Sequence, residues 1–392
     1  MAVRALARVN LAAIERNCAR LADAAAPARL CAVVKADGYG HGAAPAARAA
    51  RAGGAAWLAV ATATEAAELR AAGLDGPVLV LGALTPEELD VALAAGADVV
   101  AWREGFAAAV ANRAGEIGLA ERGTADRHTT GDGVAGHGTV GVHVKLDTGM
   151  GRLGTRDPAE ASAVAAAVAA APELRLAGAM THFATADEDD PAFLGEQLAA
   201  FSAWAPQLRA LHPDALLHAA NSAATLAHPA ARFDMVRCGI GIYGLDPFQG
   251  DPAARGLEPA LELRSYVAEV KRCAAGESTG YGRRFVAERD TWVGTIPIGY
   301  GDGYRRGLSG NADVMVEGRR VPLVGAVSMD NVTVDLGPAS HEPVARGVAT
   351  VLIGAGVPAE DLARRLGTIN YEVTCALTAR VPREFHRDGE PA

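Results

Sequence analysis

Lysine is scarce in this chain, and one of its lysines lies where imine chemistry is possible. Of the 37 basic residues, only Lys35, Lys145 and Lys271 are lysine, and Lys35 lies in AVVKADGYGHG, between an apolar run and a glycine-rich turn. A lysine amine that is desolvated or close to other cations loses its proton and attacks a carbonyl to form an imine, whereas arginine stays protonated. We therefore interpret Lys35 as an imine-forming lysine; the alternative is a surface lysine without a chemical role.

Further polar residues follow other apolar runs of the first 240 residues. They are Lys145 and Asp147 after the fifth run, His182 after the sixth, Asn221 and Ser222 after the seventh, and Arg237 at the end of the eighth. In a (β/α)8 barrel the carboxyl ends of the strands carry the active site, and the loops after the last two strands commonly bind phosphate. Ser222, Gly239 and Gly241 suit a phosphate site built on backbone N–H groups. A phosphate site facing an imine-forming lysine indicates pyridoxal 5'-phosphate as the cofactor.

The elements that must position these residues are eight short apolar runs separated by alanine-rich amphipathic segments. The predicted strands are Arg29–Val34, Trp57–Thr62, Pro77–Leu81, Asp98–Trp102, Gly141–Leu146, Leu174–Thr181, Leu216–Ala220 and Phe233–Arg237. Segments between them, such as TATEAAELRAAG, end in glycine as a helix C-cap does. Eight strand–helix units predict a (β/α)8 barrel. A doubly wound sheet is the alternative, but it needs GxGxxG after its first strand, and GYGHGA resembles that motif only superficially.

The sequence pattern changes near Glu258. Segments such as TWVGTIPIGY and NVTVDLG alternate or run apolar between glycine-rich turns, and helical patterns are scarce apart from one near Pro358–Leu366. This pattern is typical of a mostly β domain. We therefore predict an α/β protein with a barrel at residues 1–247 that binds the cofactor, followed by a mostly β domain at residues 248–392.

Composition limits the partners and the location. The net charge of -9 argues against nucleic acid as a partner. The five cysteines have no CxxC pairing, and the N-terminus has neither a signal-peptide pattern nor a membrane span, so we expect a cytoplasmic protein without a membrane partner. Residues 123–139 have the composition of a surface loop, and we expect His128 and His137 there to be solvated, with no metal site.

Nine segments, in order from about residue 5 to residue 385, resemble the signature blocks of the alanine racemases. The segments are AVVKADGYGHG, KLDTGMGRLG, THFATADE, HAANSAAT, MVRCGIGIYG, YGRRFVA, IPIGYGDGYRR, VSMDN and TINYEV. That resemblance implies a barrel followed by a β domain, a head-to-tail homodimer with shared active sites, and pyridoxal phosphate as cofactor. It implies interconversion of L-alanine and D-alanine, which supplies D-alanine for peptidoglycan.

The resemblance also implies which residues act as bases. Lys35 is implied to form the internal imine and to act as base on one face of the substrate, and Tyr281 of the partner subunit to act on the other face. Racemisation requires such a pair because one proton leaves Cα and another arrives on the opposite side. His182 is implied to hydrogen-bond Tyr281, because a phenol with a pKa of about 10 is a weak base at neutral pH unless its neighbours favour the phenolate.

Two arginines have roles implied by the resemblance. Arg237 matches the arginine that faces the pyridine nitrogen, and His218 matches the residue that supports it. Because a guanidinium keeps its proton, it donates a hydrogen bond without protonating the ring, which limits leakage into transamination. Arg152 is implied to contact the cofactor's phenolic oxygen and the substrate carboxylate. Lys145 matches a lysine that is carbamylated in many members of the family, which turns its cation into an anion that orients this arginine. An ion pair between unmodified Lys145 and Asp147 is the alternative.

The remaining contacts are implied in the same way. The groups implied to hold the cofactor phosphate are the hydroxyls of Tyr39, Ser222 and Tyr371 and the backbone of Gly239 and Ile240. Tyr300 and Tyr371 are implied to form a narrow gate for small substrates. The backbone N–H of Met329 is implied to hold the substrate carboxylate from the partner subunit. Asp302 and Asp330 fall in matching blocks but receive no chemical role.

Three other functions share parts of this pattern. A broad-specificity amino-acid racemase differs only in the width of the gate. A barrel-type pyridoxal phosphate decarboxylase of basic amino acids shares the lysine on the first strand, but it needs a Cys-x-x-Asp-like motif in the β domain, and VKRCAAG and VTCALT lack that form. A non-enzymatic pyridoxal phosphate carrier is a single barrel and has no use for Tyr281 or Met329.

Overall fold

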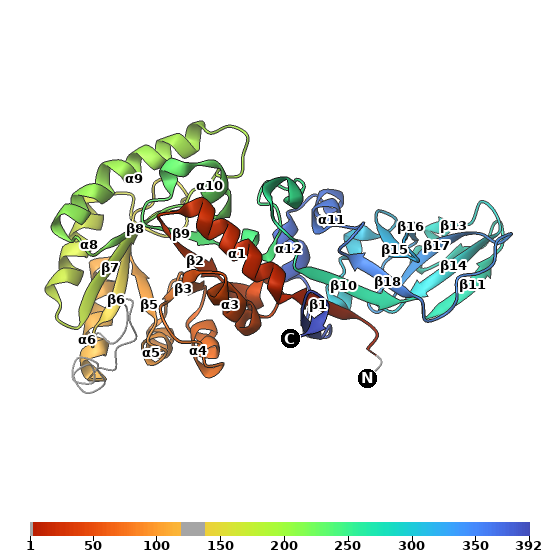
Figure 1. Ribbon diagram of the computed structural model, residues 1–392, viewed down its shortest axis with the longest axis horizontal. Helices are drawn as coiled ribbons and strands as arrows, with labels where there is room; N and C mark the ends of the chain where they lie inside the picture. The colour runs from red at the N-terminus through yellow and green to blue at the C-terminus, as the bar shows by residue number, and fades with distance from the viewer. Residues whose placement is uncertain (1–2, 119–137) are drawn as a thin grey trace. The chain divides into compact units, whose positions relative to one another are not determined.

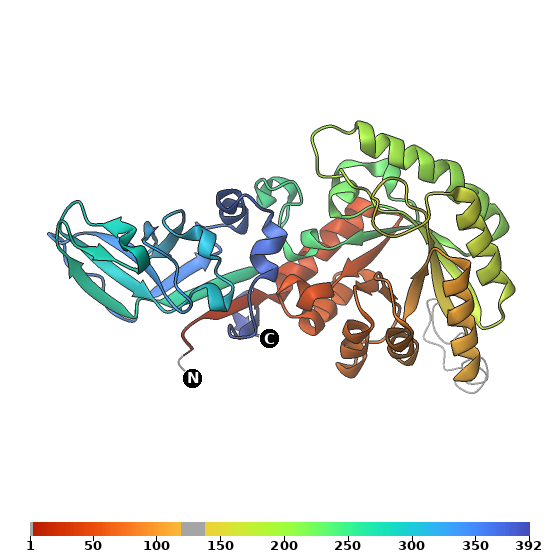
Figure 2. The same cartoon turned by 180° about the vertical axis from the view of Figure 1, so that it is seen from behind.

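The computed structural model describes residues 3–118 and 138–392, which form two compact units. The barrel unit comprises Glu15–Gly38 and Ala43–Ile242, and the β unit comprises Met1–Ile14, Tyr39–Gly42 and Tyr243–Ala392. Figure 1 and Figure 2 show, from opposite sides, the helices around the barrel strands in one unit and the mostly β-stranded second unit. The predicted fold class, a (β/α)8 barrel followed by a mostly β domain, is confirmed.

Eight parallel strands close into the barrel in the order of the sequence. They are β2 (Arg29–Val33), β3 (Ala55–Val60), β4 (Val78–Val80), β5 (Asp98–Ala101), β6 (Val140–Lys145), β7 (Leu174–Met180), β8 (Leu216–His218) and β9 (Met235–Cys238). Each apolar run predicted as a strand is one of these, with ends that differ by at most two residues. Most of their residues are buried, because the barrel interior covers one face of each strand and the helices cover the other.

Alanine-rich helices surround the barrel. They are α1 (Leu11–Ala25), α3 (Ala43–Ala52), α4 (Ala63–Ala71), α5 (Pro86–Ala94), α6 (Glu104–Glu116), α8 (Pro158–Ala170), α9 (Ala192–Leu211) and α10 (Ser222–Ala227). Thr62 and Thr85 begin α4 and α5 with capping boxes, in which each hydroxyl accepts from the N–H of Glu65 or Glu88 and that glutamate accepts in return. Within residues 3–118 and 138–392, no helix is both long enough and apolar enough to cross a membrane.

The β unit is built on a ten-stranded sheet in the order β11-β14-β17-β16-β15-β18-β10-β1-β19-β20. Its strands are β1 (Leu6–Asn10), β10 (Leu261–Tyr266), β11 (Glu269–Cys273), β14 (Thr291–Ile296), β15 (Asp313–Val316), β16 (Arg319–Val324), β17 (Val332–Pro338), β18 (Ala349–Ile353), β19 (Arg383–Arg387) and β20 (Glu390–Pro391). A separate pair joins β12 (Ser278–Thr279) to β13 (Phe285–Val286). The predicted helix near Pro358–Leu366 is α11 (Ala359–Leu366), whereas α12 (Asn370–Cys375) was not predicted.

The division of the chain differs from the predicted boundary at the N-terminus. Residues 1–14, which we predicted to belong to the barrel domain of residues 1–247, lie in the β unit, because β1 pairs antiparallel with β10 and parallel with β19. Burial alternates along β1, as it does in a strand with one covered face, whereas every residue of the barrel strand β6 is buried. Residues 123–137 of the predicted surface loop, with His128 and His137, lie outside the described residues.

Candidate active site

Lys35 begins an unusual left-handed turn directly after β2. The turn is α2 (Lys35–Tyr39), in which φ is 53° at Ala36, 52° at Asp37 and 54° at Tyr39. Such angles cost non-glycine residues on the order of 1 kcal/mol each, so they persist only where other contacts hold them. Glu65 supplies one such contact, since its carboxylate accepts from the N–H of Ala36 at 2.6 Å. The turn keeps Lys35 half-buried at the carboxyl end of its strand.

Arg237 is a buried cation whose described hydrogen-bond partners are all neutral groups. Its Nη1 lies 2.8 Å from His218 Nδ1, and its Nη2 donates to the carbonyls of Thr181 at 2.7 Å and Ala219 at 3.0 Å. Nη2 also lies 3.3 Å from His182 Nδ1. Burial lowers the pKa of Arg237 to about 10, so the guanidinium keeps its charge at neutral pH. His218 therefore lies within hydrogen-bonding distance of Arg237, as its predicted supporting role requires.

Lys145, the last residue of β6, lies among other cations. The pKa of its amine is lowered to about 8, chiefly by burial and then by the charges of Arg237 and Arg152. Lys35 has a smaller effect in the same direction, and Asp147 partly opposes the shift. The Asp147 carboxylate accepts from the N–H groups of Gly149 at 3.1 Å and Gly151 at 3.0 Å, and Arg156 lies 3.3 Å away. Asp147 thus holds the loop that carries Arg152, which is itself exposed.

His182 experiences the same positive surroundings. Burial, followed by the charges of Arg237, Lys145, Arg152 and Lys35, keeps the pKa of its imidazole well below the ordinary value. These side chains therefore come together near the carboxyl ends of β2, β6, β7 and β9, as predicted, and they carry an excess of positive charge. A site of this kind suits a ligand with anionic groups, such as a phosphate and a carboxylate.

The predicted phosphate-binding residues of the barrel unit also come together. Asn221 caps α10 by accepting from the N–H of Ala224 at 3.0 Å. Ser222 Oγ, at the start of that helix, accepts from the N–H of Gly239 at 3.1 Å and of Gly241 at 3.3 Å. A Cβ at residue 241 would lie 3.3 Å from Leu21 Cδ1 and 3.4 Å from Ser222 Oγ, so the turn η2 (Ile240–Tyr243) runs close to the start of the helix.

Two of the predicted tyrosines contact each other within the β unit. The rings of Tyr39 and Tyr371 lie 6.0 Å apart, centroid to centroid, and Tyr39 also packs against Tyr243 at 5.1 Å. His41 stacks on Tyr243 at 4.4 Å. Our sequence reasoning did not select His41 or Tyr243, although both lie in matched blocks, GYGHG and GIYG. They form an aromatic support for the two tyrosines.

The two residues predicted to act in a partner's site, Tyr281 and Met329, are exposed on the β unit, and so is the predicted gate residue Tyr300. Tyr281 is 74% exposed, Met329 52% and Tyr300 41%. The carbonyl of Met329 accepts from the N–H of Gly301 at 2.9 Å, which keeps Met329 beside the turn of Tyr300. The side chains of Tyr281 and Met329 are therefore accessible to a second molecule.

The two aspartates without a predicted chemical role have structural partners. Asp302 is buried, accepts from the N–H of Gly299 at 2.9 Å and pairs with Arg4. Asp330 pairs with Arg380 at 2.6 Å. Both carboxylates thereby stabilise the loops that hold Tyr300 and Met329.

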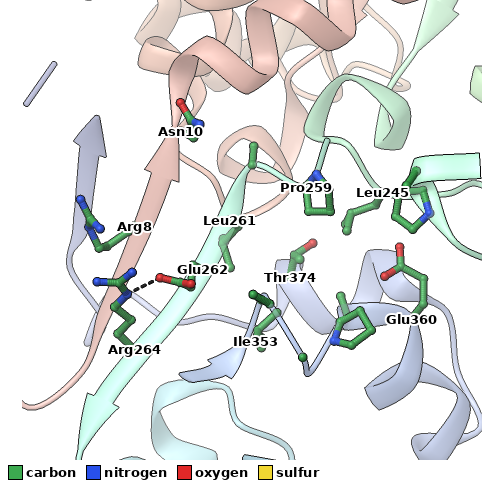
Figure 3. A pocket seen from close by; sticks show the side chains of 18 of the residues that line it. Arg8, Asn10, Leu245, Pro259, Leu261, Glu262, Arg264, Ile353, Glu360 and Thr374 are labelled. Atoms are coloured by element: carbon green, nitrogen blue, oxygen red, sulfur yellow. Dashed lines mark hydrogen bonds and ion pairs between the residues drawn. The ribbon is translucent and has the colours of Figure 1, made fainter. Parts of the chain in front are cut away.

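A separate cavity of about 500 Å³ lies within the β unit. Figure 3 shows Arg264 paired with Glu262 at one side and Glu360 at the other. Residues predicted for the site are missing from its described lining. We place the candidate site at the barrel strand ends because cationic groups converge there, whereas the two arginines that line this cavity are paired with carboxylates, Arg264 with Glu262 and Arg8 with Glu384.

Two polar residues that our sequence reasoning missed lie beneath the candidate site. His143 is fully buried and contacts both His218, at 2.8 Å, and Asp98, at 3.3 Å. A signal was available, because His143 precedes Lys145 by two residues in GVHVKLD and therefore points to the same face of the strand.

Comparison with known proteins gives one consistent result along the whole chain. The family model described as the N-terminal domain of alanine racemase matches residues 9–247, and the model of its C-terminal domain matches residues 260–385. The alanine racemase of Desulfovibrio desulfuricans is 39% identical over 97% of each chain, and that of Thermobifida fusca is 41% identical over 97% of each.

Solved structures agree with this result. The alanine racemase of the D-cycloserine-producing Streptomyces lavendulae is 36% identical, has a TM-score of 0.88 and covers 98% of each chain. The enzyme of Bacillus anthracis with bound L-Ala-P is 33% identical, with a TM-score of 0.83 over 100% of this chain and 97% of that one. The resemblance of the nine sequence blocks is thereby confirmed, and the chain belongs to the alanine racemase family of isomerases.

Proposed function

We propose that this protein interconverts L-alanine and D-alanine with pyridoxal 5'-phosphate as its cofactor, in a homodimer whose subunits share each active site. The observation that carries the proposal is the convergence of Lys145, Arg237 and His182 with Lys35 and Arg152 at the barrel strand ends. The barrel, residues 1–247, would bind the cofactor, and the β domain, residues 248–392, would supply residues to the partner subunit.

The residues present fit a phosphorylated pyridine aldehyde. Lys35 would hold its aldehyde carbon, and Ser222, Gly239 and Ile240, with Tyr39 and Tyr371, would hold its phosphate. The buried charge of Arg237, matched only by neutral partners, suits the ring nitrogen. When bound, the cofactor withdraws electrons from the substrate and thereby acidifies the proton on Cα.

Lys35 and Tyr281 of the partner subunit would move the proton. The Lys35 amine takes or returns a proton on one face of Cα, and the Tyr281 phenol does so on the other. The exposure of Tyr281 supports this role, because a base that serves a partner must project from its own subunit. His182 accepts at Nδ1 from Arg237, which leaves its Nε2–H to donate to the phenolate oxygen of Tyr281 and to favour that form.

The substrate carboxylate would be held by Arg152 and by the backbone N–H of Met329 of the partner subunit. Tyr300 and Tyr371 would restrict the entrance to small substrates. Lys145 would orient Arg152. With a pKa of about 8, a large share of its amine is neutral near that pH, and a neutral amine can add carbon dioxide and release one proton to form an anionic carbamate. The ion pair with Asp147 is the alternative.

The cellular role follows from the reaction. The enzyme would supply D-alanine for peptidoglycan in the cytoplasm. The cysteine content supports a reducing compartment, since none of the five cysteines forms a CxxC pair.

A chiral assay tests the proposal. The purified chain is loaded with pyridoxal 5'-phosphate and incubated separately with L-alanine, L-serine and L-lysine, and the enantiomers are then separated. We expect D-alanine to form fastest. Comparable racemisation of all three amino acids would make the enzyme a broad-specificity racemase, and release of carbon dioxide from lysine would make it a decarboxylase.

A further inference from the structure

A file of hydrogen-bonded side chains crosses the interior of the barrel. It runs from Arg237 to His218 (Nη1 to Nδ1, 2.8 Å), from His218 to His143 (Nε2 to Nδ1, 2.8 Å) and from His143 to Asp98 (Nε2 to Oδ2, 3.3 Å). Asp98 begins β5, at the amino end of the barrel, whereas Arg237 lies near the carboxyl end of β9. The file therefore connects the candidate active site with the opposite end of the barrel.

The two ends of the file determine where each proton lies. A guanidinium only donates and a carboxylate only accepts. His218 Nδ1 must therefore accept from Arg237, so the proton of His218 is on Nε2 and is donated to His143. His143 Nδ1 accepts it, so the proton of His143 is on Nε2 and is donated to Asp98. Every bond then points from Arg237 towards Asp98, and both histidines are neutral.

The surroundings favour this arrangement. Burial, more than any charge, lowers the pKa of His143 and holds that of His218 well below the ordinary value. Arg175, from β7, donates to Asp98 at 3.2 Å and keeps that end of the file anionic. The charged and titratable groups facing His143 are thus Asp98, Arg175, His218 and Arg237.

Two glycines inside barrel strands leave room for the file. A Cβ at Gly141 would lie 2.2 Å from Asp98 Oδ2, and a Cβ at Gly178 would lie 2.6 Å from His143 Nδ1. Neither glycine has a positive φ, so backbone conformation does not require glycine there. Glycine weakens a strand interior, and the space for the polar side chains accounts for its presence.

We propose that His143 and Asp98 are positioning residues for racemisation, which hold His218 in the tautomer that accepts from Arg237 and so fix the guanidinium towards the cofactor ring. This inference rests on the proposed function. Without His143, His218 is free to move its proton to Nδ1, where it would oppose the N–H of Arg237. The guanidinium would then lose one of its four described hydrogen-bond partners and turn away from the ring nitrogen.

Three variants distinguish an effect of the hydrogen bonds made by His143 from an effect of its packing. His143→Gln keeps one acceptor and one donor at this position, whereas His143→Phe has neither. Trp57→Phe is the control, since Trp57 packs edge-on against the His143 ring at 5.5 Å and takes no part in the hydrogen bonds. The holoenzyme of each is prepared with ¹⁵N-labelled histidine, and the ¹⁵N spectrum gives the tautomers while kcat and KM are measured for L-alanine.

We expect His218 of the wild-type holoenzyme to carry its proton on Nε2 and to lose that preference in His143→Phe. In that variant kcat should fall on the order of 10- to 100-fold with KM little changed, since a small displacement of a positioned group has such an effect. His143→Gln and Trp57→Phe should stay near the wild type.

Two results would overturn the inference. One is a proton on Nδ1 of His218 in the wild type, which is decisive even if His143→Phe does not fold. The other is a folded His143→Phe that keeps both the tautomer and kcat. Because the tautomers are read without turnover, a wild-type enzyme that failed to racemise alanine would refute the proposed function separately.

Discussion

Burial lowers the pKa of an arginine and of a lysine in the barrel unit by similar amounts, but it leaves them at different values. The pKa of Arg237 falls to about 10, and that of Lys145, which is ordinarily lower, falls to about 8. An arginine in such a place remains a cation, and a lysine becomes able to act as a nucleophile or base close to neutral pH. This difference supports the proposed imine chemistry of Lys35, in a chain that otherwise uses arginine almost everywhere.

Replacing Lys35 tests its role directly. In Lys35→Ala we expect the absorbance of the lysine-bound cofactor, near about 420 nm, to disappear. Racemisation should fall by about 10²- to 10⁴-fold or more, because both the attachment point and a base are lost. Lys271→Ala is the matched control, since Lys271 is exposed on β11 and should be dispensable. A Lys35→Ala enzyme with the band and normal turnover would refute the assignment.

The stability of the protein should depend on pH through Lys145. Its pKa is about 8 in the folded chain and about 10.5 in an unfolded one, so between these values the unfolded chain binds more protons. The free energy of unfolding therefore rises with pH across this window, by at most about 3 kcal/mol. Lys145→Met should lack this rise. Urea unfolding of both proteins between about pH 7 and pH 11 measures the difference; parallel curves would mean that the amine does not titrate, as in a carbamate.

At the scale of elements, contacts of backbone atoms hold the conformation of residues 35–42, which follow β2. The left-handed turn at residues 35–39 leads into Gly40, where φ is 83° and a Cβ would lie 2.2 Å from the carbonyl oxygen of Thr374 in α12. The carbonyl of Gly40 also accepts from Arg383 Nε at 3.1 Å. These contacts hold residues 39–42 against the rest of the β unit, beside the contact between the rings of Tyr39 and Tyr371.

Substitution of Gly40 should therefore be more damaging than its backbone angle alone explains. Gly318 is the matched control, because its φ is 72° and a Cβ there meets nothing within 4 Å. We expect Gly318→Ala to lower the free energy of unfolding by about 1 kcal/mol, and Gly40→Ala to lower it by a further 1–3 kcal/mol, roughly, from the clash. Chemical unfolding of the two variants measures this, and equal losses would show that the clash is relieved at little cost.

At the scale of the molecule, charge is distributed unevenly. The chain carries a net charge of -9, yet buried cations gather at the barrel strand ends. A local positive site in an acidic protein attracts anionic ligands to that site. The exposed side chains of Tyr281 and Met329 on the β unit support a dimer in which each subunit completes the site of the other.

Mixing two inactive variants tests the shared site. A Lys35→Ala subunit still has Tyr281, and a Tyr281→Phe subunit still has Lys35, so a mixed dimer contains one complete site. Equal mixing should restore about a quarter of wild-type activity, because about half of the dimers are mixed and each has one of its two sites intact. Activity should stay near zero if the sites are self-contained. Subunit exchange is verified by labelling the two variants with different affinity tags.

Much of the barrel could be predicted from local pattern. Apolar runs of the right length and glycines at the ends of amphipathic segments are properties of neighbouring residues, and they predicted all eight strands. Lys35 could be singled out because residue chemistry is visible without coordinates. The convergence of Lys145, His182 and Arg237 followed from a general property of barrels, that the carboxyl ends of their strands meet at one rim.

The remaining features depend on which distant segments come together. Nothing in LARVN specifies that β1 joins β10 and β19, because a strand's alternation describes its faces and not its neighbours. The file from Arg237 to Asp98 joins residues of four strands, and it becomes visible only when barrel closure brings their inward-facing side chains within hydrogen-bonding distance. Residue types and local periodicity can be read from the sequence alone, whereas strand pairing and histidine tautomers depend on long-range packing.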